Sequence, residues 1–405
     1  MIDPYSDESL ADPVSLWKRL RSEPSVFQVP GSDRLFLVSR HADITEICAQ
    51  PEIFTNEQVA TVQRGPDRKP KLIPSATRDN PQSKVLGAAD GEVHKRHRKL
   101  LTGSFSARRI RVIDEWLKTR ARDLLKAAGS EFDVVEAIAK PLPVHAIVKL
   151  VGFPEGDWQA LGEGAIAMMT LSGGLAEPEQ VPGLMADIAW LDNYAEEQLA
   201  HRRGNREEGD AEDVLGLVSA ALDNGEIELW EAKGLIMQLI AGGGDTTVSL
   251  ICSVARRLAE NPSWQEILRN DPTQIPLFVE ETLRLDGPAI GNPRHVAADC
   301  MIGDTPIPKG ATMVLLWGSA NRDEAVFANA EQFDPKRSDL KKHIAFGKGV
   351  HVCLGSILAR METHAVAEAL LENSSVIELG CPPEELHQIP GLVIRKLEAL
   401  PLRIR

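Results

Sequence analysis

The chain has 405 residues, a net charge of −14 and 43% hydrophobic residues, which is enough for a sizeable core in one large domain or in two to three smaller ones. The negative charge disfavours nucleic acid as a partner, because phosphate binding relies on an excess of lysine and arginine. The five cysteines lie far apart, are odd in number and form no C-x-x-C pair. Neither a disulfide framework nor a zinc site is therefore predicted.

The N-terminus MIDPYSDESLADP carries acids and prolines, where a signal peptide needs basic residues followed by an apolar run. No other stretch reaches the roughly 18 uninterrupted apolar residues that a membrane span needs. We expect a cytoplasmic protein without a membrane anchor. No internal repeat or low-complexity linker is found, so one domain over residues 1–405 is the simplest expectation.

The first elements along the chain are a short strand and a long loop. Residues 35–39 read as a strand. Residues 59–91 are rich in proline and in basic side chains, and they predict a long irregular segment of the kind that forms binding loops or is disordered.

A basic stretch follows at residues 94–111, with seven Lys or Arg residues and two histidines. It fits a solvated helix face, or a patch for an acidic protein partner or an anionic cofactor. His94 and Arg98 lie four residues apart, so they share one helical face.

Helical periodicity recurs at larger intervals, and two short strands interrupt it. The strands are expected at 295–302 and 312–317, separated by the turn-rich GDTPIPKGA. Helices dominate, so the predicted fold class is mainly α with a small β region (α+β). The predicted helices are residues 112–128, 184–199, 230–260, 274–285 and 354–371.

The predicted helix 230–260 contains Gly242, Gly243 and Gly244, each costing about 1 kcal/mol relative to alanine. A flat group or bound oxygen against the backbone would explain them. The Thr246 hydroxyl can bond the carbonyl of Gly242, and Asp245 with Thr246 could relay protons in general acid catalysis. The alternative is a helix break at which Asp245 caps a second helix.

Glu281 and Arg284 lie three apart on the next predicted helix, among apolar neighbours. Exposed, such a pair would contribute only roughly 0.2–0.5 kcal/mol. Their surroundings favour burial, and a buried arginine needs several acceptors. Arg337 is expected to join the same network, with Glu281 bridging both arginines.

The run FGKGVHVCLG, from Phe346 to Gly355, leads into an apolar helical stripe and places Cys353 at a helix N-terminus. Free N–H groups and the positive helix end favour the thiolate, which is the form that binds a metal. Gly347, Gly349 and Gly355 permit tight turns and a close approach to a flat ligand. The alternative is an inert buried thiol, the interpretation preferred for the other four cysteines.

Taken together, these motifs resemble the bacterial cytochrome P450 family over nearly the whole chain. The cysteine loop matches F-G-x-G-x-H-x-C-x-G at every fixed position, and residues 242–247 match the family's glycine, acid and double-threonine motif. E-x-x-R, A-N-R-D (320–323) and H-x-x-x-R also match. Gly244 departs from the pattern, since relatives often carry a larger residue there, which leaves the groove roomier.

The resemblance implies a single triangular-prism domain that holds haem b, with Cys353 as the axial ligand of the iron. It implies dioxygen, an apolar small-molecule substrate, and electrons from a ferredoxin-type or flavodoxin-type donor with its NAD(P)H reductase. The expected haem contacts are Phe346, Gly347 and Gly355, with His94, Arg98, Arg294 and His351 at the propionates. The expected substrate contacts are Gly242, Gly243, Ala289, Ile290 and Asn292.

Two other functions stay open from the sequence. A haem-binding sensor or carrier without turnover would share the thiolate but would not need Asp245 and Thr246. A helical scaffold without haem would need none of these residues. Residues 171–181 and 58–87 are expected to shape the cavity entrance, but the sequence does not identify the substrate.

Overall fold

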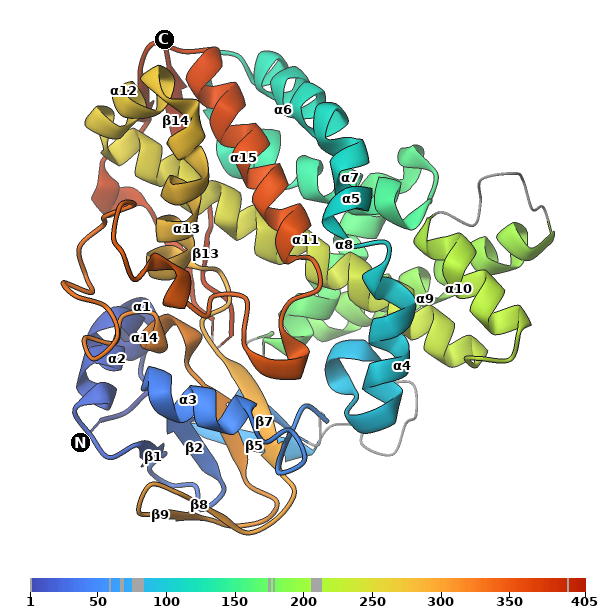
Figure 1. Cartoon of the computed structure of the whole chain (residues 1–405), viewed down its shortest axis with the longest axis vertical. Helices are drawn as coiled ribbons and strands as arrows, with labels where there is room; N and C mark the ends of the chain where they lie inside the picture. The colour runs from blue at the N-terminus through green and yellow to red at the C-terminus, as the bar shows by residue number, and fades with distance from the viewer. Residues whose placement is uncertain are drawn as a thin grey trace.

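The computed structural model describes residues 2–57, 60–65, 69–74, 84–173, 176–177, 179–204, 213–391 and 393–405. Helices dominate and strands are few, which confirms the predicted class. A large helical part adjoins a smaller part built on strands near the N-terminus (Figure 1). The helices are α1 (Asp7–Ala11), α2 (Pro13–Arg21), α3 (His41–Cys48), α4 (Gly91–Thr102), α5 (Ala107–Ile110), α6 (Asp114–Ala128), α7 (Pro141–Val151), α8 (Trp158–Ser172), α9 (Val181–Gly204), α10 (Val214–Asp223), α11 (Leu229–Glu260), α12 (Pro262–Asn270), α13 (Ile275–Asp286), α14 (Trp317–Ala320) and α15 (Ser356–Glu372).

The main sheet has five strands in the order β1-β2-β10-β7-β3, with only the β2–β10 pair parallel. A three-stranded sheet, β11-β14-β6, packs near the C-terminus. The main-sheet strands are β1 (Val26–Gln28), β2 (Leu35–Val38), β3 (Phe54–Thr55), β7 (Asn292–Val296) and β10 (Thr312–Leu315). The others are β4 (Ala60–Arg64), β5 (Pro70–Pro74), β6 (Glu131–Asp133), β8 (Cys300–Ile302), β9 (Thr305–Ile307), β11 (Ile377–Leu379), β12 (Gln388–Ile389), β13 (Lys396–Leu397) and β14 (Pro401–Ile404).

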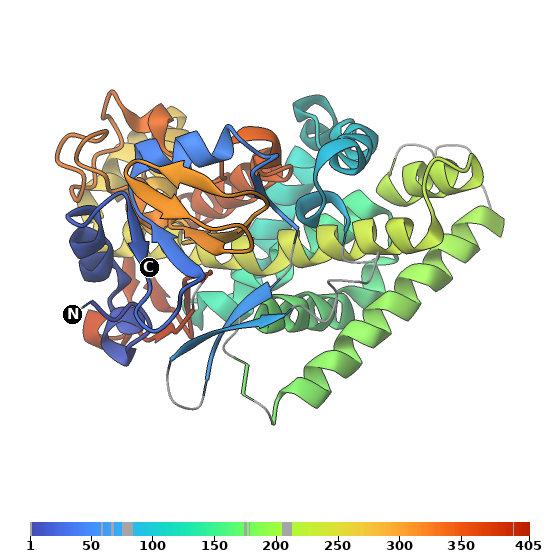
Figure 2. The same ribbon diagram turned by 90° about the horizontal axis from the view of Figure 1, so that it is seen from below.

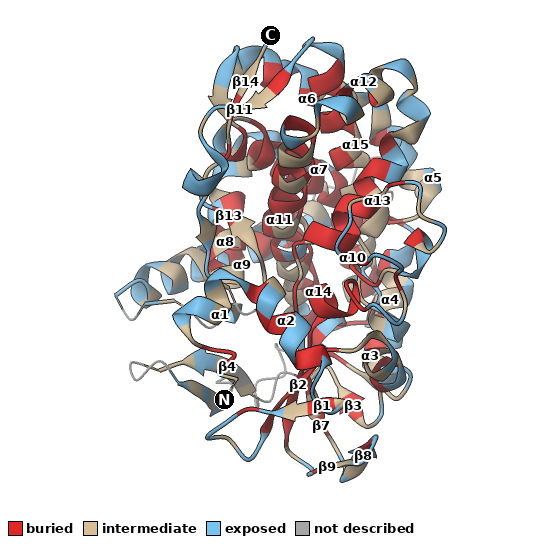
Figure 3. Ribbon diagram, turned by 90° about the vertical axis from the view of Figure 1, so that its left-hand side faces the viewer, coloured by how far each residue is buried: buried red, intermediate tan, exposed pale blue. Residues whose placement is uncertain are grey.

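Helix α11 runs through the centre of the molecule (Figure 2). At its start Glu228 and Glu231 cap each other reciprocally, and it ends before Pro262. It packs against α7, α8, α13 and α15, so most of it is coloured as buried in Figure 3. Its length and apolar composition would suffice to cross a membrane, yet 72% of that stretch is buried inside the protein, as in the core helix of a globular fold.

All five helices expected from periodicity are present as α6, α9, α11, α13 and α15. The helix break considered at residues 242–246 does not occur, because α11 continues through the three glycines. Neighbouring helices compensate for the low helical propensity of glycine, as tertiary packing often does.

Two predictions about strands and loops are wrong. Residues 59–91 are not irregular throughout, since β4 and β5 pair as antiparallel strands there, although 59, 66–68 and 75–83 lie outside the described residues. The strand expected at 295–302 is two strands, β7 and β8. Gly303, with φ +54°, lets β8 turn back onto β9, so the turn-rich segment is itself part of a hairpin.

The buried acid–arginine network predicted on α13 is confirmed. Arg284 donates from Nε and Nη2 to the two Glu281 carboxylate oxygens, both at 2.7 Å, and from Nη1 to the Asn321 carbonyl at 2.8 Å. Arg337 Nε lies 3.4 Å from the same carboxylate. Since the Asn321 side chain in turn accepts from Ile344 N–H at 2.7 Å, the network ties α13 to the chain that enters the cysteine loop.

Replacing Glu281 by alanine should therefore destabilise the protein by about 3–5 kcal/mol, because two arginines would lose their buried counter-ion. Urea unfolding measures this change. Glu266→Ala, which removes an exposed glutamate from α12, should change stability by less than about 0.5 kcal/mol. Equal effects of the two substitutions would contradict a buried network.

Candidate active site

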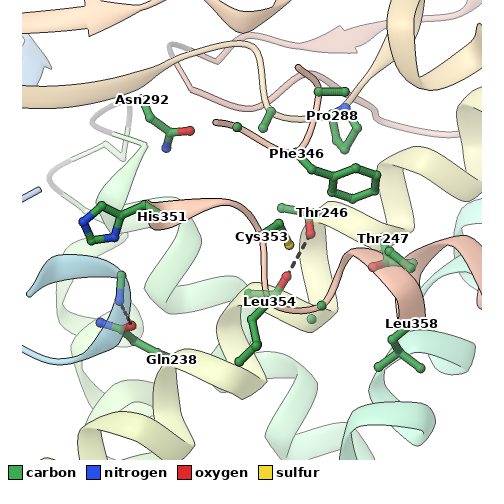
Figure 4. Close-up of a pocket in the computed structure, with 18 of the residues that line it drawn as sticks. Gln238, Thr246, Thr247, Pro288, Asn292, Phe346, His351, Cys353, Leu354 and Leu358 are labelled. Carbon is green, nitrogen blue, oxygen red and sulfur yellow. Dashed lines mark hydrogen bonds between the residues drawn. The ribbon is translucent and has the colours of Figure 1, made fainter. Parts of the chain in front are cut away.

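A cavity of about 390 Å³ lies between α11, the cysteine loop and the start of β7. Most of its exposed wall is apolar. Figure 4 draws residues that line the cavity, among them Cys353 of the cysteine loop, Thr246 of α11, Phe346 and Pro288. The volume is within the range of small-molecule sites.

The cysteine loop is closed by its own backbone. Cys353 N–H donates to the Phe346 carbonyl at 2.9 Å. Gly347 and Gly349 have φ values of +74° and +77°, and a Cβ on Gly349 would lie 2.5 Å from the Cys48 carbonyl oxygen. Glycine is therefore required at position 349 both by conformation and by contact with α3. The loop delivers Cys353 to the cavity three residues before α15 begins.

The Cys353 sulfur is placed to bind a metal from one side of the cavity. The residue is exposed because it borders this space. Burial by the surrounding protein raises the pKa of its thiol, while the Gly355 N–H and the charges of Arg98 and Arg360 oppose that rise. A bound metal would replace the proton and would keep the same N–H and positive charges as support.

Of the four residues expected at haem propionates, His351 and Arg294 line the cavity, and His94 and Arg98 contact the cysteine loop beside it. The His351 ring lies 4.1 Å from the His94 ring, and its Nε2 is 2.9 Å from Asp90. Arg98 donates to the Val352 carbonyl at 2.7 Å. Arg294 is buried and lines the cavity.

These residues fit a flat anionic ligand. His351 Nδ1 is buried without a hydrogen-bond partner among the described residues. A Cβ on Gly242 or Gly355 would meet no atom within 4 Å, so backbone is open to the cavity on both walls. Burial is also the main reason that the pKa of His94 is lowered to about 4, which leaves that ring neutral. The cavity thus offers a metal-binding sulfur, flat backbone walls and a cationic edge.

The α11 wall confirms one predicted hydrogen bond in detail. Thr246 Oγ1 donates to the Gly242 carbonyl at 2.8 Å (Figure 4). Gly242 and Gly243 line the cavity. Gly244 instead faces α8, where a Cβ would come within 3.4 Å of Ala165, so the third glycine serves helix packing and does not widen the cavity.

Asp245 lies on another face of α11, outside the cavity wall. Its side chain is buried, and both carboxylate oxygens lie 3.1 Å from Lys396 Nζ. Lys396 belongs to β13, about 150 residues away in the sequence. Sequence reasoning missed this partner, because no local pattern links a C-terminal strand to α11.

Two of the three expected contacts after α13 line the cavity, namely Ala289 and Asn292. Asn292 Oδ1 accepts from the Trp317 indole at 2.7 Å. Ile290, the third expected contact, does not line the cavity, so this prediction is wrong. Strand-like alternation turns its side chain into the N-terminal core cluster, beside residues such as Trp17 and Leu316.

Glu362 is a further cavity residue that sequence reasoning missed. It is 1% exposed, lines the cavity, and its Oε2 has no hydrogen-bond partner among the described residues. Its only sequence signal is its spacing, four residues after Leu358, on the apolar face of α15. Burial raises its pKa well above the usual 4.5.

Because burial raises the pKa of Glu362 in the folded protein above its value in the unfolded chain, the contribution of this side chain to stability falls as the pH rises above about 4.5. Glu362→Gln, which has the same shape but does not titrate, should gain stability relative to wild type as the pH rises above about 5. Urea unfolding across that range measures the difference. A constant difference would contradict a raised pKa of Glu362, and Glu266→Gln serves as the exposed control.

Comparisons with known proteins agree with this geometry. A family model described as Cytochrome P450 matches residues 184–401. Cytochrome P450 144 of Mycobacterium tuberculosis is 32% identical over 405 residues, covering 99% of this chain and 91% of that protein. Nocardicin C N-oxygenase of Nocardia uniformis subsp. tsuyamanensis is 30% identical over 408 residues, covering 96% of each. The structure of CalO2 has a TM-score of 0.88 at 27% identity, with 100% of this chain and 98% of that chain covered. The chain therefore belongs to the cytochrome P450 family and is a haem-dependent monooxygenase.

Proposed function

We propose that this protein hydroxylates an apolar small molecule with haem b, held through the Cys353 sulfur. The observation that carries the proposal is a cysteine on a closed backbone loop that lines a largely apolar cavity together with Thr246 and Gly242. The haem supplies dioxygen binding and transfer of one oxygen atom to the substrate, the other atom leaving as water. We further propose that the chain acts as a single cytoplasmic domain.

In this proposal Cys353 binds the iron, and Phe346, Gly347 and Gly355 shape the face of the loop against the ring. Arg98, Arg294, His94 and His351 take the propionates. Arginine suits this role because its planar fork donates two parallel bonds to a carboxylate. The unpartnered Nδ1 of His351 supplies a further donor or acceptor.

The proton supply runs through Thr246 and Asp245. The Thr246 hydroxyl donates a hydrogen bond to the Gly242 carbonyl. Its oxygen can still accept a hydrogen bond from a water in the cavity. Asp245 is on the far face of α11 and is held by Lys396, so it delivers a proton only when that ion pair loosens or a water bridges to it. Lys396 thereby sets when the acid is available.

The substrate lies over the cavity side of α11, against Gly242, Gly243, Ala289 and Asn292. Apolar walls, such as those of Ile147 and Leu239, bind an apolar molecule and exclude water from the reaction. Hydroxylation at a C–H bond does not require a charged group on the substrate. An uncharged substrate is therefore compatible with the apolar walls.

An acidic ferredoxin-type protein is the proposed electron donor. A basic patch formed by Lys99, Arg108, Arg111 and Lys348 is exposed. Arg98 joins α4 to the cysteine loop, and α5 contacts α15, so both basic segments border the Cys353 side of the site. Positive charge there would steer an acidic partner even though the whole chain is negative.

Replacing Cys353 by histidine should change the carbon-monoxide spectrum of the reduced protein, because a neutral nitrogen would replace an anionic sulfur at the iron. Cys381→Ser removes a thiol that does not line the cavity, so the spectrum of this control should be the same as that of wild type. An unchanged spectrum in Cys353→His, or pure wild-type protein without haem, would remove the basis of the proposal.

Asp245→Asn should lower product formation by about 100-fold, since the amide cannot donate a proton as the acid does. Lys396→Met keeps the carboxylate and should retain more activity. Product and NADPH consumption are measured with a ferredoxin system. If Asp245→Asn behaves like wild type and no candidate substrate raises consumption, a haem sensor or carrier explains the protein better.

Arg108→Glu should raise the KM for an acidic ferredoxin by roughly 10-fold at low salt, and the effect should fade as salt screens the charges. Lys126→Glu makes the same change of net charge on the exposed surface of α6 and is the control. Equal responses of the two variants would mean that net charge, and not the basic patch, guides the donor.

A further inference from the structure

Leu86 has an unusual backbone conformation at the cavity wall. Its φ is +37°, and among the described residues only Asn329 shares a positive φ without being glycine. Asparagine tolerates this region, whereas leucine is strained there by its Cβ. Leu86 is 9% exposed and lines the cavity. Strain of this kind persists only where surrounding contacts impose it.

Gln238 of α11 holds Leu86 in this backbone conformation from one side. Its amide oxygen accepts from Gly87 N–H at 3.0 Å, and its amide nitrogen donates to the Val85 carbonyl at 2.9 Å. Figure 4 shows the first of these bonds. The two bonds grip the backbone immediately before and after Leu86. No apolar side chain could make either bond, and an ionised glutamate could accept but not donate.

His97 of α4 holds the same turn from the other side. Its Nδ1 accepts from Leu86 N–H at 3.2 Å, so the ring proton must lie on Nε2, which is 3.0 Å from Glu231. Glu231 and Gln238 are seven residues apart on α11 and so lie two turns apart on one face. Both grips are thus anchored on the same rigid helix.

The turn's position gives it a role in substrate selection. Gln238 is one helical turn before Gly242, which opens onto the cavity. Leu86, Gly87 and Phe105 line the same space. If the Gln238 bonds were absent, Leu86 could relax to a negative φ, and its side chain would leave this wall.

We propose that Gln238 is a positioning residue that limits substrate size. It does so by holding Leu86 in its left-handed turn, where the Leu86 side chain is part of the cavity wall. This inference rests on the proposed function. The class of substrate affected is apolar and bulky. Small molecules bind beside Gly242 without touching the wall, and larger ones meet the Leu86 side chain.

The test uses the haem-loaded protein and three probes of increasing size: imidazole, 4-phenylimidazole and clotrimazole, each followed by its spectral change. In Gln238→Leu the affinity for clotrimazole relative to imidazole should rise at least tenfold, while imidazole itself changes less than threefold. Gln238→Glu, which keeps the bond from Gly87, should lie between. Gln332→Leu makes the same chemical change at an exposed position and should leave all three affinities unchanged.

Leu86→Gly is a second test of the same proposal. Glycine adopts a positive φ without strain, and the substitution removes the side chain that forms this part of the cavity wall. It should raise the relative affinity for clotrimazole as Gln238→Leu does, and the double variant should gain no more than either single one. Independent, additive gains would contradict the proposed coupling.

Hydrogen exchange supplies a readout that does not depend on haem. The amides of Leu86 and Gly87 should exchange more than tenfold faster in Gln238→Leu than in wild type. Unchanged exchange together with an unchanged size preference would overturn the inference. A wild-type protein that gives no spectral change with any imidazole would instead contradict the proposed function, so the two failures are distinguishable.

Discussion

The backbone hydrogen bond from Cys353 to the Phe346 carbonyl is the constraint on which the rest of the site depends. It closes a loop whose turns require glycine, and contact between Gly349 and the Cys48 carbonyl presses that loop against α3. The sulfur therefore has one position relative to α11. Because a metal ligand must be placed within tenths of an ångström, such a closed loop is better suited to the task than a flexible one.

Buried charges stiffen the frame around this loop. Arg284 and Arg337 share Glu281, and a second buried acid, Asp286, lies among four arginines. Burial alone would raise the pKa of Asp286, but Arg257 and its neighbours lower it. Removing one member of such a network leaves an uncompensated charge in a poorly solvated place. These ion pairs hold α13 and the chain that follows it in place. That following chain brings Ala289 and Asn292 to the cavity.

The site separates its largely apolar cavity from Asp245, the acid proposed to supply protons. Thr246 is on the cavity wall, whereas Asp245 is turned away and paired with Lys396. Glu362 borders the same space, and burial raises the pKa of its carboxyl, which favours the neutral form. Most of the cavity wall is thus apolar, while Arg294 lines the cavity and Arg98 lies against the cysteine loop. Such a division agrees with the proposed binding of an apolar molecule next to an anionic cofactor.

Local patterns in the sequence were sufficient for the helical class, the cysteine loop, the glycine-rich helix and the Thr246–Gly242 bond, because each depends on residues within about one or two helical turns of each other. The Glu281–Arg284 pair was predictable for the same reason. Tertiary structure alone decided the partner of Asp245, the hydrogen bonds of Gln238 around Leu86, the direction of the Ile290 side chain and the raised pKa of Glu362. Those features depend on which distant segments meet and on how far water is excluded, and neither is encoded in local spacing.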